Sequence, residues 1–397
     1  MSNRGHSSLR SSSDSLDEVA AALLRAIAVG ARGWVLLWSA APTALLDQAR
    51  PATPQRGRRH ERLRAAKTLL AGLARSRGSA LTMVDDILFA HEGANPAATL
   101  DPVIEALARS RATPPAERVV RPPFSLLVAG LRDLRHARTA VDRELPTGVP
   151  ASLERALQAA VRARARAVTA LDGLSPRLVV LASQHSTSSR AFIHAARERS
   201  IPTAYLPHAP VADTYQYRDL PTDFAGLRGP REVDFYRSLG AERDASVVGN
   251  PQASVKVPPR LDPEGPVIFA PRPQAPEQLR AQVAEISAVA PRVVVSPHPR
   301  MSGRPQYEGL WPSHWDVHDG WTAELLAQGY PCVIQMSSGV AWEAMAHGVP
   351  VIELAPETSG APLYLVIREP FALVCTSDAD LRCGRRRSAG GGRPGGA

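Results

Sequence analysis

Lysine is almost missing from this chain, which has only Lys67 and Lys256 among its 47 basic residues. Aromatic residues are scarce too, at 5% of 397 positions. Surfaces that bind nucleic acids usually interleave basic and aromatic side chains, so these shortages argue against a nucleic-acid partner despite the net charge of +9. We interpret the charge as a compositional bias toward arginine.

Cysteine is also rare, and Cys332, Cys375 and Cys383 have neither disulfide-framework nor metal-ligand spacing. The chain contains no run of about 18 apolar residues, the length that would predict a transmembrane helix. Residues 1–17 are rich in serine and lack the apolar core of a secretory signal, so we expect them to be disordered. Together these absences indicate a protein of the reducing cytoplasm.

A basic cluster at residues 56–77 contains Glu61 as its only acid. Two interpretations stay open. The cluster could contact anionic lipid at the inner face of the membrane, or it could be the solvated face of a helix.

Clustered carboxylates of the kind that hold a divalent ion are missing from the predicted strand ends, so we expect no metal and no cofactor. The alternating residues His314, Asp316 and His318 have metal-ligand chemistry and could share one face of a strand. The alternative is a surface loop. The other acidic pair, Asp378 and Asp380, lies beside the C-terminal tail and is typical of a helix start.

The composition changes abruptly at residues 382–397, which contain six glycines and five arginines and no large apolar residue. Such a segment cannot bury enough surface to offset the entropy of ordering it, so we expect disorder there. We interpret the change as a shifted reading frame or a truncated chain, with the loss of a closing helix. The alternative is a basic tail that contacts anionic membrane or RNA.

The remaining chain is predicted to form two α/β halves. Residues 18–252 form the first half, with helical insertions, and a proline-rich linker at 253–265 leads to the second half at 266–381. In the first half, residues 33–39 are predicted to be a strand, and residues 40–147 are predicted to contain mainly helices, including 126–144.

Two stretches of the second half carry ligand-type residues at strand ends. Residues 293–295 are three valines, a predicted buried strand, and the following Pro-His-Pro corner projects His298 and Arg300 from a stiff turn. Residues 331–353 predict a strand, a turn, a short helix and a parallel strand. Ser337, Ser338 and Gly339 lie where that helix begins, a position that favours an anion.

Glu343 lies about one turn into the same helix, within reach of a sugar hydroxyl beside a bound phosphate. The first half contains a similar unit, with strands at 177–182 and 201–206 and His208 just past the second strand. Open α/β sheets bind ligands at such strand ends. A histidine near its reference pKa suits a general base, and arginine or N–H groups suit a leaving phosphate.

These motifs, taken in order, resemble the GT-B superfamily of nucleotide-sugar transferases. Within it the chain is similar to the bacterial capsule polysaccharide, polysialyltransferase and CDP-glycerol glycerophosphotransferase group. The resemblance spans residues 177–374, and its most specific part is the Glu-Ala-Met-Ala-His-Gly-Val-Pro-Val segment at 343–351. It implies two Rossmann-like domains facing a cleft, with the acceptor on the first domain and the donor nucleotide on the second.

The resemblance also implies roles for single residues. His298, Ser337 and Ser338 would hold the donor phosphates, Glu343 would bind the donor ribose, and His208 would be the catalytic base or an acceptor-side contact. Many relatives have glycine after this histidine, whereas this chain has Ala209.

The implied activity is transfer of a sugar or glycerophosphate from a nucleotide-activated donor to a cell-surface polysaccharide, glycan or lipid-linked acceptor, without a metal. Two alternatives stay open. One is a UDP-N-acetylglucosamine 2-epimerase-like enzyme, which shares the fold, and the other is a non-catalytic or degenerate nucleotide-binding protein.

Overall fold

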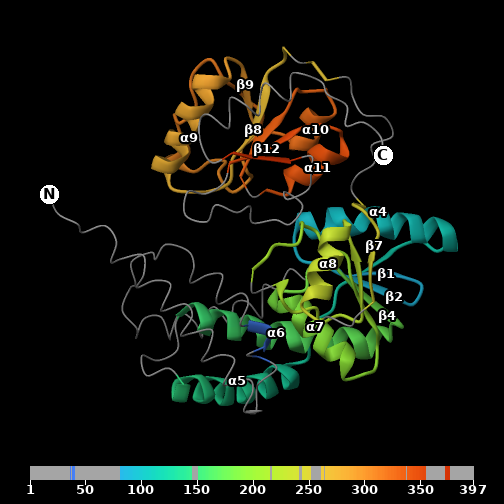
Figure 1. Cartoon of the computed structure of the whole chain (residues 1–397). Coiled ribbons are helices and arrows are strands. Elements are labelled where there is room, and N and C mark those ends of the chain that lie inside the picture. The colour runs from blue at the N-terminus through green and yellow to red at the C-terminus, as the bar shows by residue number, and fades with distance from the viewer. Residues whose placement is uncertain are drawn as a thin grey trace. The chain divides into compact units, whose positions relative to one another are not determined.

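Figure 1 shows a computed structural model of the chain. The structure describes residues 36, 38–40, 81–144, 151–214, 217–240, 244–251, 261–262, 264–336, 338–354 and 372–375. The predicted disordered ends, the basic cluster at 56–77 and most of the predicted linker lie outside these residues, as does Ser337. None of the described helices is long and apolar enough to cross a membrane.

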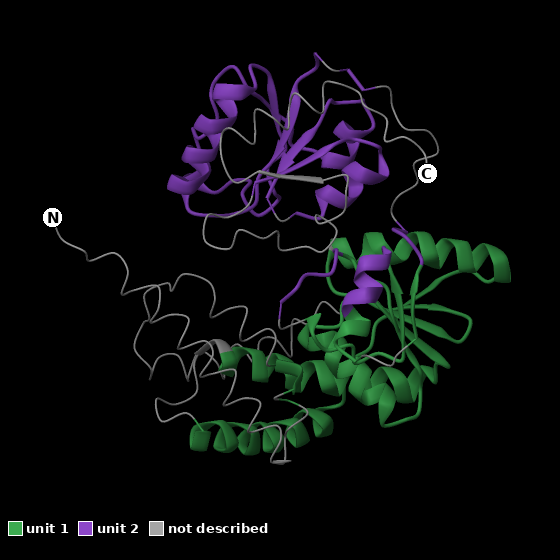
Figure 2. Cartoon of the chain, in the orientation of Figure 1, with its two compact units in different colours: residues 1–208, 215–227, 236–247 green, residues 209–214, 228–235, 248–397 purple. Residues whose placement is uncertain are grey.

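The chain divides into two compact units, coloured separately in Figure 2. Unit 1 comprises Met1–His208, Tyr215–Leu227 and Tyr236–Val247. Unit 2 comprises Ala209–Thr214, Arg228–Phe235 and Val248–Ala397. Each unit contains its own sheet with helices, which confirms the predicted α/β fold class.

Unit 1 is built on a seven-stranded sheet with the order β3-β1-β2-β4-β5-β6-β7. Its β1 and β2 form an antiparallel hairpin, and from β2 onward all neighbours are parallel. Parallel neighbours bring their carboxyl ends to the same edge. The strands are β1 (Leu81–Val84), β2 (Ile87–Ala90), β3 (Ala116–Arg118), β4 (Leu178–Leu181), β5 (Thr203–Tyr205), β6 (Phe224–Leu227) and β7 (Asp244–Val247).

The helices of unit 1 differ in how deeply they are buried. Helix α7 has ten buried residues, Thr187 to Ala196, because the alanine-rich α6 packs closely beside it. Small side chains such as Ala167 and Ala170 allow this close approach. The helices are α4 (Ala94–Arg111), α5 (Phe124–Glu144), α6 (Ala151–Leu174) and α7 (Thr187–Arg197), while the division between the units falls within α8 (Pro230–Ser238).

The predicted strand at residues 33–39 is wrong where it can be compared, because Leu36, Trp38, Ser39 and Ala40 are helical. Leu36, Ser39 and Ala40 are almost fully buried, a spacing of three and four that belongs to one face of a helix. Trp38 is only half-buried, and its ring stacks under the Arg190 guanidinium at 4.5 Å. Val35, Leu36 and Leu37 form a short apolar run between Trp34 and Trp38, and such a run fits a buried strand as well as a buried helix.

The β1–β2 hairpin was not predicted from the sequence. Its two strands are four residues each and lie in a region of helical composition. The signal was present, since two apolar runs flank Asp85 and Asp86 and a two-residue turn of this kind favours a hairpin. Asp85 adopts φ 52°, as such a turn requires.

Unit 2 contains a six-stranded sheet with the order β10-β9-β8-β11-β12-β13, parallel throughout. Successive residues along a strand face two different hydrophobic cores, one on each side of the sheet. Val267 and Phe269 of β8 face one cluster with Trp315, while Ile268 faces the other with Leu326. The strands are β8 (Val267–Ala270), β9 (Val293–Val295), β10 (Asp316–Val317), β11 (Val333–Gln335), β12 (Val351–Leu354) and β13 (Ala372–Cys375).

Strands β8, β9, β11 and β12 are buried on both faces, which explains why they are mainly apolar runs rather than alternating ones. The helices are α9 (Pro276–Val289), α10 (Thr322–Leu326) and α11 (Val340–Ala346), with a 3-10 turn η2 at Pro305–Tyr307. The predicted strand, helix and parallel strand at 331–353 are confirmed as β11, α11 and β12.

Helices α5 and α6 approach each other at Gly130. A Cβ added there would lie 2.6 Å from Cγ1 of Val161, which is itself buried. We expect Gly130→Ala to destabilise the protein by about 1 kcal/mol, because an overpacking cost of about 1–3 kcal/mol exceeds a helix-propensity gain of about 1 kcal/mol.

Urea unfolding of a double mutant checks this expectation. In a Val161→Ala background the clash is gone, so Gly130→Ala should become stabilising, by roughly 0.5–1 kcal/mol. The same sign in both backgrounds would show that the two helices do not meet at this residue.

Candidate functional site

The strand order of unit 2 reverses beside β8. From β8 the chain passes to β9 on one side and, later, to β11 on the other, so both are neighbours of β8. Such a reversal forces the crossovers apart and opens a crevice outside the carboxyl ends of the two strands. The predicted residues after β9 and after β11 therefore flank the carboxyl end of β8 at one edge of the sheet.

The His-Pro corner follows β9 as predicted. The backbone N–H of Arg300 donates to Nδ1 of His298 at 3.1 Å, which leaves the proton of the neutral ring on Nε2. Burial, and secondly the charge of Arg300, lower the pKa of His298 from its ordinary value. At neutral pH His298 therefore offers an N–H donor rather than a positive charge, and Arg300 supplies the charge at this corner.

The turn after β11 is held from beneath by two buried side chains. Gln335 donates through Nε2 to the carboxylate of Glu353, and its Oε1 accepts the backbone N–H of Ser338 at 2.7 Å. The hydroxyl of Ser338 accepts the N–H of Val340 at 3.3 Å. The N–H groups of Ser338 and Val340, at the helix start expected to face an anion, thus donate to groups within the protein. Ser338 can instead donate its hydroxyl hydrogen to a ligand.

Glu343 lies on α11, as the sequence indicated. Burial raises the pKa of its carboxyl group, and the positive charge of Arg228, also in unit 2, opposes that rise. Trp342 beside it has an indole N–H that is buried and has no hydrogen-bond partner among the described residues. A partly buried carboxyl group next to an unsatisfied donor suits a ligand with hydroxyl groups.

Arg272, near the end of β8, is a further candidate that was not predicted from the sequence. It lies two residues beyond Ala270, the last residue of β8, and is half-buried. Its position at the central strand makes it the cation nearest in sequence to the reversal point. The local Ala-Pro-Arg-Pro pattern resembles the Pro-His-Pro-Arg corner, a signal that could have identified it.

The polar residues 314–319 do not form the extended face that a metal site would need. Strand β10 is only Asp316–Val317, and His318 lies 3.4 Å from Glu324 through Nε2. Among the residues that the structure describes, no group of three His, Cys, Asp or Glu is placed to hold a metal ion.

His208 lies in unit 1, just past β5. Its Nδ1 donates to the carbonyl oxygen of Ala182 at 2.6 Å, and its backbone N–H donates to the same oxygen at 3.0 Å. A carbonyl only accepts, so this contact fixes the neutral tautomer with its proton on Nδ1 and its basic lone pair on Nε2. Nε2 is therefore the ring atom on which His208 would accept a proton.

His185 is brought close to His208 from the loop after β4. The two ring centroids are 6.3 Å apart, and the His185 ring also contacts Tyr217 at 5.0 Å. Burial, followed by the charges of His208 and Arg190, lowers the pKa of His185 to about 4. Its Nδ1 is buried without a hydrogen-bond partner among the described residues.

The loop that carries His185 is fixed by buried polar contacts. Arg190 donates to the carbonyl oxygen of Gln184 at 3.3 Å and forms an ion pair with Asp219 at 3.2 Å. Gln184 donates to the Tyr236 hydroxyl at 2.7 Å. These contacts connect the loop after β4 to α7, to the segment between β5 and β6, and to Tyr236 of α8.

Comparison with known proteins yields only distant structural similarity. No protein-family model and no curated protein matches the chain. The chain is similar to a crystal structure of CalG4, the calicheamicin glycosyltransferase, with 18% identity, 76% of this chain and 89% of that chain covered, and a TM-score of 0.44.

Two further solved structures are similar to the chain. For the glycotransferase of kitacinnamycin the identity is 12%, the coverage is 69% of this chain and 88% of that chain, and the TM-score is 0.37. For the glycosyltransferase SnogD from Streptomyces nogalater the identity is 16%, the coverage is 59% of this chain and 74% of that chain, and the TM-score is 0.30. At these identities and TM-scores the likeness assigns no activity, so the residues themselves carry the functional inference.

The buried His185 predicts a pH-dependent stability. The unfolded chain binds a proton on this ring near pH 6.5 and the folded chain only near pH 4, so the unfolded state binds more protons between these values. The neutral ring therefore contributes stability above pH 6.5 that is lost as the pH falls toward 4. The full loss is about 3 kcal/mol.

Urea unfolding at several pH values, compared between the wild type and His185→Phe, measures this contribution. The variant keeps an aromatic ring against Tyr217 but cannot titrate, so its stability should fall less steeply between pH 6.5 and 4. Parallel curves for the two proteins would contradict the assignment.

Proposed function

We propose that the protein is a transferase that moves a sugar or glycerophosphate from a nucleotide-activated donor to a glycan or lipid-linked acceptor. The observation that carries the proposal is the reversal of strand order beside β8, with ligand-type residues at the neighbouring strand ends. The sequence resemblance to nucleotide-sugar transferases of the capsule polysaccharide group supports it.

In this proposal the donor binds at the carboxyl edge of the unit 2 sheet. Arg300 and Arg272 supply positive charge for the phosphates, the neutral His298 donates through Nε2, and Ser338 donates through its hydroxyl. Gly339 begins α11 with no side chain between its backbone and the ligand. Glu343 accepts from a donor hydroxyl.

His208 is proposed as the general base that removes the proton of the acceptor hydroxyl. Its Nδ1 contact with Ala182 keeps the lone pair on Nε2, and the bond formed is between the acceptor oxygen and the transferred group. The bond to the leaving nucleotide phosphate breaks, and the cationic and N–H groups of unit 2 stabilise the charge that develops there. No metal is required in this scheme.

Nucleotide binding tests the donor site directly. Isothermal titration with CMP, CDP, UDP and GDP should give binding by at least one nucleotide. His298→Ala and Ser338→Ala should each weaken it by about 1–3 kcal/mol, the value of a lost hydrogen bond to a charged group.

His314→Ala and Ser313→Ala are the matched controls, because both residues are exposed in the same unit. They should leave the affinity unchanged. Equal affinities in all four variants, with intact folds, would remove the donor-site assignment.

Turnover tests the role of His208. With a donor and acceptor pair identified by screening, His208→Asn should lower kcat by about 10²–10⁴-fold, the usual contribution of a general base, and leave nucleotide affinity nearly unchanged. His136→Asn, an exposed histidine of α5, is the control. Activity in EDTA should equal activity in magnesium.

Near wild-type turnover in His208→Asn would place the base elsewhere. A large loss in EDTA would overturn the metal-independent scheme.

A further inference from the structure

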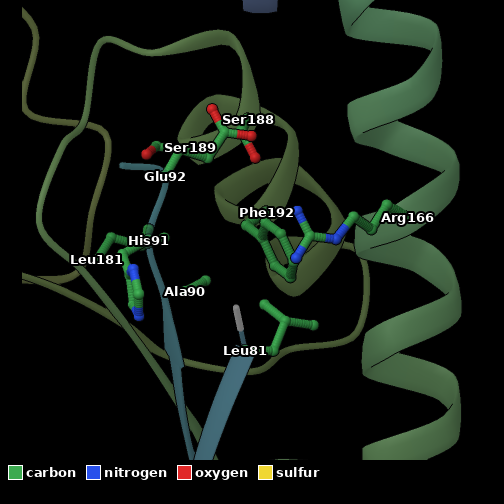
Figure 3. Close-up of a pocket in the computed structure, with 9 residues that line it drawn as sticks. All are labelled: Leu81, Ala90, His91, Glu92, Arg166, Leu181, Ser188, Ser189 and Phe192. Atoms are coloured by element: carbon green, nitrogen blue, oxygen red, sulfur yellow. The ribbon is translucent and has the colours of Figure 1, made fainter. Parts of the chain in front are cut away.

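The hollow shown in Figure 3 is too small for an organic ligand. It lies between β2, α6 and the first turn of α7, and it has room for about one water molecule. A further partner of unit 1 is therefore better sought on the surface of the unit. Large apolar side chains are exposed there at the start of α5.

Three apolar side chains form an exposed ridge at the start of α5. Val119 is 73% exposed and Phe124 is 71% exposed, the highest values for large hydrophobic residues in the part of the chain that the structure describes. Leu131 is also exposed and lies seven positions after Phe124, two turns along the same face of the helix. We call Val119, Phe124 and Leu131 the apolar ridge. Apolar residues grouped in this way, unlike single scattered ones, mark an interaction surface.

Another face of α5 is committed to packing, which fixes the direction of the ridge. The buried residues of the helix follow a spacing of three and four, and they are Leu127, Gly130, Leu134, Ala137 and Val141. This face meets α6, where Gly130 approaches Val161, and Arg138 pairs with Glu154 of α6 at 3.1 Å. Figure 1 shows α5 at the outside of unit 1, with α6 between it and α7. The ridge cannot turn inward without breaking the contact between α5 and α6.

The surroundings of the ridge are positively charged. Residues 118–132 include no acidic residue. The exposed basic residues of this stretch and the next turn are Arg118, Arg121, Arg132 and Arg135. The one acid before Arg135 is Asp133, which is half-buried and interacts within the protein. Four arginines and one aspartate give residues 118–135 a net charge of +3.

An anionic lipid surface matches both properties of the ridge. Its phosphates attract basic side chains, and apolar side chains of an interfacial helix enter the boundary between head groups and acyl chains. A second copy of the chain fits less well, because the same surface on both copies would place arginine opposite arginine. A single-stranded nucleic acid stacks on several aromatic side chains, and the ridge has only Phe124.

We propose that the apolar ridge and its arginines dock the protein on a bilayer that contains anionic lipid. Phe124 and Leu131 enter the head-group region, and the arginines bind lipid phosphates. The contact is peripheral, with α5 lying along the surface. Docking does not depend on the proposed transferase function, although a lipid-linked acceptor would be presented at the same surface.

Flotation of the full chain with lipid vesicles tests the proposal. Vesicles that mix phosphatidylcholine with phosphatidylglycerol should bind the protein, and vesicles of phosphatidylcholine alone should bind much less. High salt should weaken the binding, because it screens the arginines. Phe124→Ser should weaken it about tenfold, as expected for a large apolar side chain that no longer leaves water. Arg121→Gln should weaken it about fivefold, the effect of one basic group near an anionic surface.

Phe224→Ser and Arg109→Gln are the matched controls. Phe224 is exposed on β6, and Arg109 is exposed on α4. Helix α4 packs on the face of the sheet opposite to α6, so Arg109 lies away from the ridge. Both controls should bind vesicles as the wild type does. Thermal unfolding checks that all four variants fold, and the exposure of Phe124 and Arg121 makes them safe to replace.

Absence of flotation with anionic vesicles would overturn the proposal. Flotation that Phe124→Ser and Arg121→Gln leave unchanged would also overturn it, because another part of the chain would then bind the lipid. Sedimentation velocity without lipid and titration with a single-stranded RNA test the other two occupants. A dimer or an RNA complex that Phe124→Ser disrupts, without vesicle binding, would assign the ridge to that partner. The assay contains no donor nucleotide, so its outcome is independent of the transferase function.

Discussion

Parallel strand pairing is the constraint on which the rest of this structure depends. A parallel neighbour can be reached only through a crossover, so every loop that follows a strand emerges at the same edge of its sheet. In unit 1 this rule brings His91, His185 and His208 to one edge. In unit 2 it brings the His298 and Ser338 turns to either side of β8. The grouping of the candidate residues at one edge of each sheet therefore follows from the order and direction of the strands.

Burial then sets the protonation states at both edges. The pKa values of His91, His185 and His298 are all lowered, with burial as the largest cause, and that of Glu343 is raised for the same reason. Neutral rings and a carboxyl group of weakened acidity exchange hydrogen bonds and protons more readily than fixed charges do. Positive charge is left to arginine, whose charge persists under burial.

The sequence predicted the parts of the site that are local. An apolar run between turn-forming residues defines β9, β11 and β12, and the residues after each run follow directly. It did not predict the order of strands, because crossovers rather than local patterns decide that β11 lies beside β8. The role of Arg272 depends on this order. Nor could it show that Gln335 occupies the Ser338 N–H, since that contact requires Glu353 to hold the amide in place. The strand predicted at residues 33–39 was wrong because a short apolar run fits a buried strand and a buried helix equally well.

The burial of α7 limits how this protein can change its ligand preferences. Ten of its residues have neighbours on every side, so a substitution along the helix alters packing before it alters recognition. His91 and Glu92, which follow β2, are half-buried and exposed and are not constrained in this way. Variation among descendants of this sequence would therefore accumulate at residues 91 and 92, while α7 and the buried loop before it stay constant.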